Sequence, residues 1–355
     1  MSLGRAWVHN MDKKLDEAAA AGLEGIEVFY EDLEYLAKSL PGGATDENRT
    51  QAAHQIRSVC DDRNLEIICL QPFLHSEGLR DRQKRTEKIK ELKLWFFLAQ
   101  ILRIDLIQIP ASFLPESEIT GDLDVIVQDF REVAELGATY DPPFRFAFES
   151  LCFSTYINTW EQCWDVVQKV DRPNFGICLD TFNIAGMIYA DPASVSGKTS
   201  NAESETKASM ERLVKTIDVE RVFFVQVVDA EKLESPLVKG HEFYDPDLVP
   251  RMSWSRNCRL FYGEEDRGGY LPIKDVTRAI IQGLGFQGWV SMELFNRSMN
   301  DAAASVPRSH AQRAETAWHK ILADLNCQPQ KSAPQAILGE KPAMTASEPR
   351  EISML

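Results

Sequence analysis

Short apolar runs alternate with longer amphipathic stretches along most of the chain. Seven of these runs have the composition of buried strands: Gly25–Tyr30, Leu65–Phe73, Leu106–Ala111, Phe144–Ser150, Phe175–Thr181, Val222–Asp229 and Trp289–Phe295. Nearly continuous apolar runs separated by helix-forming sequence are typical of parallel strands buried on both faces. The order therefore predicts an α/β protein, built either as a doubly wound sheet or as a (β/α)₈ TIM barrel.

Three of the intervening stretches predict helices with clear ends, over Asp12–Leu23, Asp81–Leu102 and Asp275–Gly283. Glycine follows or ends the first and the third, and glycine commonly stops a helix. Seven strands are one fewer than a barrel needs, and Met1–Gly4 resembles the last residues of a further strand. We therefore expect strand 1 of the barrel to be truncated at the N-terminus, which would leave backbone groups of its neighbours unpaired.

Two segments depart from the alternation. Ala230–Gly269 is a long connection rich in proline, tyrosine and charge, and such connections are commonly substrate loops or lids. Gln328–Leu355 is rich in proline, alanine and serine without apolar periodicity, which predicts a disordered C-terminal tail. We expect residues 1–327 to form a single catalytic barrel domain, a length that one barrel with insertions can have.

Composition narrows the partners and the compartment. The 355 residues carry a formal net charge of −15, which repels phosphate backbones and argues against a nucleic-acid partner. The seven cysteines are odd in number and form no CxxC pair, as expected of reduced thiols in an intracellular protein. Neither a signal peptide nor a membrane span is recognisable, so we expect a cytoplasmic protein with a small-molecule substrate. The oligomeric state is left open.

Polar residues end or interrupt four consecutive apolar runs: Glu149, Asp180, Gln226 and Glu293. The carboxyl ends of barrel strands face the active site. Burying several carboxylates together is costly unless a cation compensates them, and oxygen ligands of this kind suit Mg²⁺ or Mn²⁺. A single strand-end carboxylate is more often a helix cap or half of an ion pair, whereas four in succession favour a divalent metal site.

Other polar residues each have two possible roles. Glu27, inside Gly25–Tyr30, is either a further inward carboxylate or a structural polar group of the barrel interior. Ser255 and Arg259 lie within the predicted loop, and an arginine beside a hydroxyl can clamp a substrate carboxylate, although this spacing is also common on surfaces.

The histidines are assigned by their predicted elements. His75 follows a strand and is a candidate proton carrier, while a lone loop histidine is more often a hydrogen-bonded surface group. His9 and His241, also in predicted loops, are equally ambiguous. The other three fall on predicted helices and are expected to be structural: His54, His310 and His319.

Eight strings together resemble the fungal-type 3-dehydroshikimate dehydratase family of the xylose isomerase-like TIM barrel superfamily. They are SLGR, GIEVFYEDL, CLQPFLHSEGLRDR, IQIPASFLP, FAFES, CLDTFNIAG, WSRNCRLFYGEEDRGGYLP and VSMELFNRS, and they extend the resemblance over residues 1–325. The resemblance implies a metal-dependent lyase that dehydrates 3-dehydroshikimate to protocatechuate (3,4-dihydroxybenzoate) in quinate and shikimate catabolism, through a metal-stabilised enediolate.

The same resemblance implies roles for individual residues. The family's metal ligands fall on Glu149, Asp180, Gln226 and Glu293, with Mn²⁺ or Mg²⁺ the favoured ion and Co²⁺ a further candidate. Its carboxylate-binding pair falls on Ser255 and Arg259.

The proton-abstracting base does not follow from the resemblance. Asn183 stands where bacterial relatives carry a histidine, and asparagine cannot accept a proton at neutral pH. His75 is therefore our leading candidate for the base, and it is grouped with Glu149 and Glu293 as catalytic. His241, expected to bind substrate, and a metal-bound water are the alternatives.

Three other functions remain to be weighed. A sugar or sugar-acid isomerase or epimerase would keep the metal quartet but would not need the Ser255–Arg259 pair. An endonuclease of the same superfamily would use many histidines, whereas this chain has six. A regulatory, non-catalytic relative would account for the truncated first strand.

Overall fold

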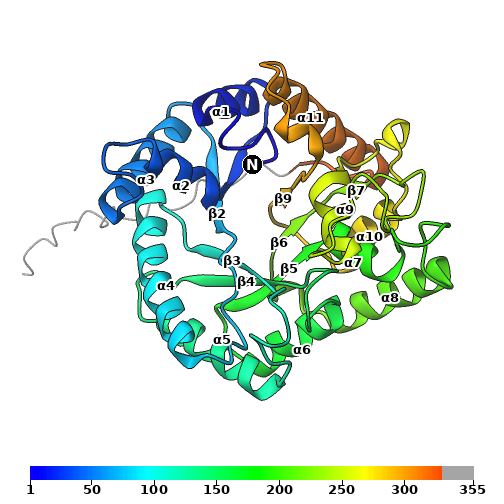
Figure 1. Ribbon diagram of the computed structural model, residues 1–355, viewed down its shortest axis with the longest axis horizontal. Helices are drawn as coiled ribbons and strands as arrows, with labels where there is room; N and C mark the ends of the chain where they lie inside the picture. Colours follow the sequence, from blue (N-terminus) through cyan, green and yellow to red (C-terminus); the bar gives the residue numbers. More distant parts are fainter. Residues whose placement is uncertain (330–355) are drawn as a thin grey trace, which may run out of the picture.

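The alternating runs fold into a curved parallel sheet with helices around its outside (Figure 1). The computed structural model describes residues 1–329, so nearly all of the predicted tail at 328–355 lies outside the described part. Seven parallel strands form one nearly closed barrel in the order β1-β2-β3-β4-β5-β6-β9, and a second, two-stranded sheet pairs β7 with β8. The prediction of a TIM barrel is confirmed.

The strands are β1 (Gly25–Phe29), β2 (Glu66–Gln71), β3 (Leu106–Pro110), β4 (Arg145–Glu149), β5 (Phe175–Asp180), β6 (Val222–Gln226), β7 (Asp229–Ala230), β8 (Arg259–Leu260) and β9 (Val290–Ser291). The α-helices are α1 (Met11–Ala20), α2 (Tyr30–Lys38), α3 (Asp46–Asp61), α4 (Arg82–Leu102), α5 (Leu123–Gly137), α6 (Trp160–Val170), α7 (Thr181–Ile188), α8 (Ala202–Thr216), α9 (Pro250–Cys258), α10 (Ile273–Arg278) and α11 (Val306–Leu325). No helix within residues 1–329 combines the length and the apolar character needed to cross a bilayer.

Two predicted elements differ from the structure. The run Trp289–Phe295 forms only the two-residue strand β9, so Glu293 lies just beyond a strand and not within one. The segment Ala230–Gly269 is not a plain loop, because it contains α9 and β8. Pro250 begins α9, a position where proline costs no hydrogen bond.

The barrel has an open side between β1 and β9, which are the two ends of the seven-stranded sheet. Met1–Gly4, expected to be the end of a strand, instead lies in turns, and the Met1 ammonium donates to Asp32 Oδ2 at 2.8 Å. A cavity of about 760 Å³ lies along this open side and is lined by residues of both edge strands and by Met1. We call it the seam cavity.

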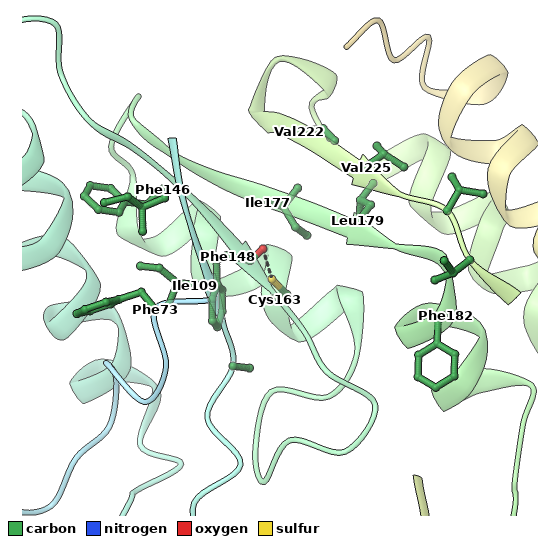
Figure 2. Packing of buried hydrophobic residues seen from close by; sticks show 14 of the residues in the cluster. Phe73, Ile109, Phe146, Phe148, Cys163, Ile177, Leu179, Phe182, Val222 and Val225 are labelled. Carbon is green, nitrogen blue, oxygen red and sulfur yellow. Dashed lines mark hydrogen bonds between the residues drawn. The ribbon is translucent and has the colours of Figure 1, made fainter. Parts of the chain in front are cut away.

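Each strand divides its side chains between two apolar layers. Side chains such as Phe146, Phe148, Ile177 and Val225 belong to the large core shared with the helices (Figure 2). A smaller cluster consists of residues of β2 to β6: Ile68, Cys69, Leu106, Ala147, Cys178 and Phe224. Because successive side chains of a strand point to opposite faces, this smaller cluster marks the interior of the barrel.

Candidate active site

Strand periodicity directs a ring of polar side chains into the mouth of the barrel. In five strands a polar residue, at the strand end or, for Gln108, inside β3, lies two positions after a member of the interior apolar cluster, so it points to the same side. The pairs are Cys69 and Gln71, Leu106 and Gln108, Ala147 and Glu149, Cys178 and Asp180, and Phe224 and Gln226. Parallel pairing aligns these ends, since Asp180 is opposite Gln226. The ring therefore follows from the sequence pattern and the sheet register together.

Arg259 lies among the acidic groups of this ring. Its Nη1 atom is 2.8 Å from Asp180 Oδ2 and 3.1 Å from Glu293 Oε2. The guanidinium also stacks over the ring of Phe182, 4.2 Å from its centroid, and the whole side chain is buried. The partners of Arg259, the predicted clamp for a substrate carboxylate, are here carboxylates of the protein itself.

Ser255 supports this placement of the arginine. It lies on α9, and its hydroxyl accepts a hydrogen bond of 3.2 Å from Arg259 Nε. The structure therefore brings the predicted serine and arginine together, beside the predicted metal ligands.

Two amides hold Glu149 from either side. Gln108 Nε2 donates to one carboxylate oxygen, and Asn183 Nδ2 donates to the other at 2.9 Å. The Asn183 carbonyl in turn accepts from the Cys152 backbone N–H at 3.0 Å. Asn183 is therefore buried and holds the carboxylate of Glu149 in place.

A second set of hydrogen bonds converges on Glu27. Gln71 Nε2 donates to Glu27 Oε2 at 2.5 Å and to Glu293 Oε1 at 2.8 Å. Gln226 Nε2 donates to Glu27 Oε2 at 3.1 Å, and Ser291 donates to the other oxygen. Of its two readings, Glu27 is thus an inward carboxylate of the same cluster, which we call the acidic cluster: Glu27, Glu149, Asp180, Gln226 and Glu293.

Burial makes ionisation of three of these groups, Glu149, Glu293 and Glu27, unfavourable. Desolvation, followed by the charges of Asp180 and Glu293, raises the pKa of Glu149 well above its usual value. Desolvation also raises the pKa of Glu293 to about 8, although Arg259 opposes the shift. Desolvation raises the pKa of Glu27 while its hydrogen bonds from Ser291, Gln226 and Gln71 lower it. One buried guanidinium therefore compensates these acids incompletely.

The donor set fits a hard divalent cation in its chemistry. Three carboxyl groups surround one arginine, and Gln108 Oε1 beside Glu149 is buried without a hydrogen-bond partner. Excess buried negative charge and free oxygen lone pairs are what such an ion compensates. Within residues 1–329, however, no three His, Cys, Asp or Glu side chains are already arranged as ligands around one point. Arg259 occupies part of the position between Asp180 and Glu293, so an ion there requires the guanidinium to move.

His75 is placed at the barrel mouth but outside the acidic cluster. It follows β2 with a left-handed backbone (φ 55°), and its Nδ1 lies 3.0 Å from Ser112 Oγ. Its ring meets Phe113 edge to face at 4.5 Å. Desolvation and the nearby charge of Lys88 lower the pKa of His75 to about 4, so the imidazole is neutral at pH 7.

The other histidines lie outside the acidic cluster. His241 Nδ1 accepts from the Phe243 backbone N–H at 3.0 Å, a contact within its own loop. His9 Nε2 lies 2.8 Å from the Asp301 carbonyl oxygen. The three histidines predicted to be structural lie on helices as expected, His54 on α3 and His310 and His319 on α11.

Sequence reasoning missed two residues of the site, Gln71 and Gln108. Both are amides within otherwise apolar runs, the same signal that identified Gln226. The structure shows that each binds a carboxylate of the acidic cluster.

The curved barrel and the polar ring at the carboxyl ends of its strands define an α/β-barrel protein with a buried acidic site. The model of the family described as xylose isomerase-like TIM barrel matches residues 15–321, and the chain belongs to that family. Within it, the chain is 53% identical to a Neurospora crassa protein named 3-dehydroshikimate dehydratase, over 92% of either chain.

Solved structures share the barrel fold. A xylose isomerase-like TIM barrel/4-hydroxyphenylpyruvate dioxygenase fusion protein is 25% identical, with a TM-score of 0.67 over 89% of this chain and 41% of that chain. The IOLI protein, described with a bound zinc atom, is 18% identical, with a TM-score of 0.63 over 89% of this chain and 94% of that one. The second likeness supports the fold alone.

Proposed function

We propose that this chain is a metal-dependent 3-dehydroshikimate dehydratase that releases protocatechuate, as a step in quinate and shikimate catabolism. The observation that carries the proposal is the acidic cluster with Arg259 and Ser255 beside it, in a chain 53% identical to a protein of that name. Mn²⁺ or Mg²⁺ is the proposed cofactor, held by Glu149, Asp180, Gln226 and Glu293. The proposed setting is the cytoplasm.

The chemistry requires removal of a proton beside a ketone. In 3-dehydroshikimate the C3 ketone acidifies the C4 proton, and loss of that proton to a base gives an enolate. The C5 hydroxyl then leaves as water, taking up a proton, and tautomerisation by transfer of a C6 proton to the C3 oxygen completes the aromatic ring. A divalent ion supplies Lewis-acid stabilisation of the negative charge that develops on the substrate oxygens, a contribution of several kcal/mol.

The residues of the chain have separate tasks in this proposal. Arg259, released from Asp180 and Glu293, binds the C1 carboxylate together with the Ser255 hydroxyl and so orients the ring. His75, neutral at pH 7, accepts the C4 proton. Gln108 and Asn183 hold Glu149 in place, and the buried surroundings of the cluster exclude water from the charge being stabilised.

The decisive test is an incubation of the purified chain with 3-dehydroshikimate and Mn²⁺ or Mg²⁺, with and without chelator. We expect the ultraviolet absorbance of an aromatic product, abolished by chelator and restored by added metal. A sugar isomerase would produce no aromatic absorbance, and equal rates with and without chelator would exclude the metal-dependent mechanism.

A further inference from the structure

Glu27, on β1, accepts hydrogen bonds from one proposed ligand, Gln226, and from two neighbouring side chains. Its Oε2 atom accepts from Gln226 Nε2 at 3.1 Å and from Gln71 Nε2 at 2.5 Å, and its Oε1 accepts from Ser291. Cys69 Sγ, its pairing partner on β2, lies 3.8 Å from Oε2. The proposed function gives Glu27 no role, because it is not one of the four proposed ligands.

The bond to Gln226 selects one of two orientations of an amide. A glutamine amide can rotate by half a turn, which exchanges its oxygen and its nitrogen. A carboxylate only accepts hydrogen bonds, so Glu27 holds the nitrogen toward itself and leaves the Gln226 oxygen directed elsewhere. That oxygen has only the weak thiol donor Cys178, at 3.6 Å, so a lone pair remains available. The rotated amide would present N–H groups to a cation, which they repel.

A second path leads from Glu27 to Glu293. Gln71 uses its nitrogen for both carboxylates, with 2.5 Å to Glu27 and 2.8 Å to Glu293 Oε1. The other oxygen of Glu293 is the one that contacts Arg259. Without Glu27, the Gln71 amide loses the acceptor that fixes its orientation, and Glu293 loses a fixed donor.

We propose that Glu27 is a positioning residue of the ion site, which orients Gln226 directly and Glu293 through Gln71. This inference rests on the proposed function, since it presumes that these two residues hold an ion. Partners that orient metal ligands in this way typically change affinity for the ion by about 10–100-fold when they are removed.

The test measures Mn²⁺ binding by calorimetry and by the electron paramagnetic resonance signal of free Mn²⁺, without substrate. Glu27→Met keeps the length of the side chain and removes both acceptors, so we expect the dissociation constant for Mn²⁺ to rise by about 10–100-fold. Glu27→Gln keeps one acceptor for Gln226 and can turn its own amide nitrogen toward Ser291. Its affinity should therefore lie between those of Glu27→Met and the unaltered protein. Glu24→Gln, at the exposed position just before the same strand, is the control and should bind Mn²⁺ normally.

The possible outcomes distinguish failure of the positioning role of Glu27 from failure of the proposed metal-dependent function. If the unaltered protein binds Mn²⁺ and Glu27→Met binds it equally well, the positioning role is wrong while the ion site stands. If the unaltered protein binds no Mn²⁺, the proposed metal-dependent function fails and the inference fails with it. Should Glu27→Met not fold, Gln71→Met tests the path to Glu293, and unchanged Mn²⁺ affinity in that variant overturns the proposal.

Discussion

Arg259 Nη1 lies 2.8 Å from Asp180 Oδ2, in a pair from which water is almost entirely excluded. The same nitrogen is 3.1 Å from Glu293. The carboxylates are thus bound to a cation that belongs to the chain, in the position where the proposed function requires an external one. If these carboxylates hold a metal ion as proposed, the ion competes with the guanidinium for the same oxygens, and metal binding is then coupled to release of Arg259.

This competition predicts an unusual effect of metal on stability. Arg259→Met leaves buried carboxylates without their partner, and we expect the free energy of unfolding to fall by about 3–5 kcal/mol. Saturating Mn²⁺ should raise the thermal midpoint of the variant more than that of the unaltered protein, because no guanidinium has to be displaced. Arg297→Met, on a half-exposed ion pair with Glu231, is the matched control. Equal Mn²⁺ effects in Arg259→Met and the unaltered protein would contradict the competition.

Removal of a proposed ligand should abolish metal retention and turnover together. We expect Glu149→Ala and Glu293→Ala to lose product formation, and to retain no Mn²⁺ after gel filtration. Glu87→Ala, an exposed position on α4, should behave as the unaltered protein in both assays. Product formation in either cluster variant at the normal rate would exclude that residue from the mechanism.

His75 is tested as the base by separating turnover from metal binding. His75→Asn should lower kcat by about 10²–10⁴-fold, the usual contribution of a general base, and should leave the dissociation constant for Mn²⁺ unchanged. His319→Asn, at an exposed site on α11, controls for loss of an imidazole. An unaltered kcat in His75→Asn removes this residue from the reaction and directs the search to other groups near the cluster.

Glu77 makes the stability of the fold depend on pH. Its Oε1 accepts from the Ser112 backbone N–H at 2.6 Å, its Oε2 is buried without a partner, and desolvation raises its pKa to about 7. Between pH 4.5 and 7 the folded protein keeps a proton that the unfolded chain has released, so this group destabilises the fold as the pH rises.

Denaturant unfolding of the unaltered protein and of Glu77→Gln at pH 4.5 and pH 8 measures this effect. Relative to the unaltered protein, the free energy of unfolding of Glu77→Gln should increase by up to about 3 kcal/mol as the pH rises from 4.5 to 8. Each pKa unit corresponds to about 1.4 kcal/mol. Glu116→Gln, an exposed change in the neighbouring loop, should show no such shift. Parallel pH profiles for Glu77→Gln and the unaltered protein would contradict the assignment.

The ring of strand-end residues could be predicted because side chains alternate between the two faces in every apolar run. Glu149, Asp180 and Gln226 all end strands that are buried on both faces, and alternation directs them inward. Glu293 was placed within a strand that is shorter in the structure. The edge strand β9 has a partner on only one side, so fewer of its residues are held in extended pairing.

The contacts of Arg259 could not be predicted from the sequence. Its neighbours Asp180 and Glu293 are 79 and 34 residues away along the chain, and their meeting depends on how β8 and α9 fold over the barrel mouth. The apolar positions of α9 have little helical periodicity, so the sequence predicts a loop for this segment. The order of the strands is a local pattern, whereas the pairing of charges is a property of the assembled barrel.

The seam cavity has a consequence for association between molecules of this protein at high concentration. Among residues 1–329, no strand pairs with the outer edges of β1 and β9, so their backbone groups can accept an extended segment of another molecule. The same cavity is lined by Glu27, Gln71 and Glu293, so a segment bound there would contact residues of the acidic cluster. Association through this seam would therefore appear as a specific activity that changes with protein concentration.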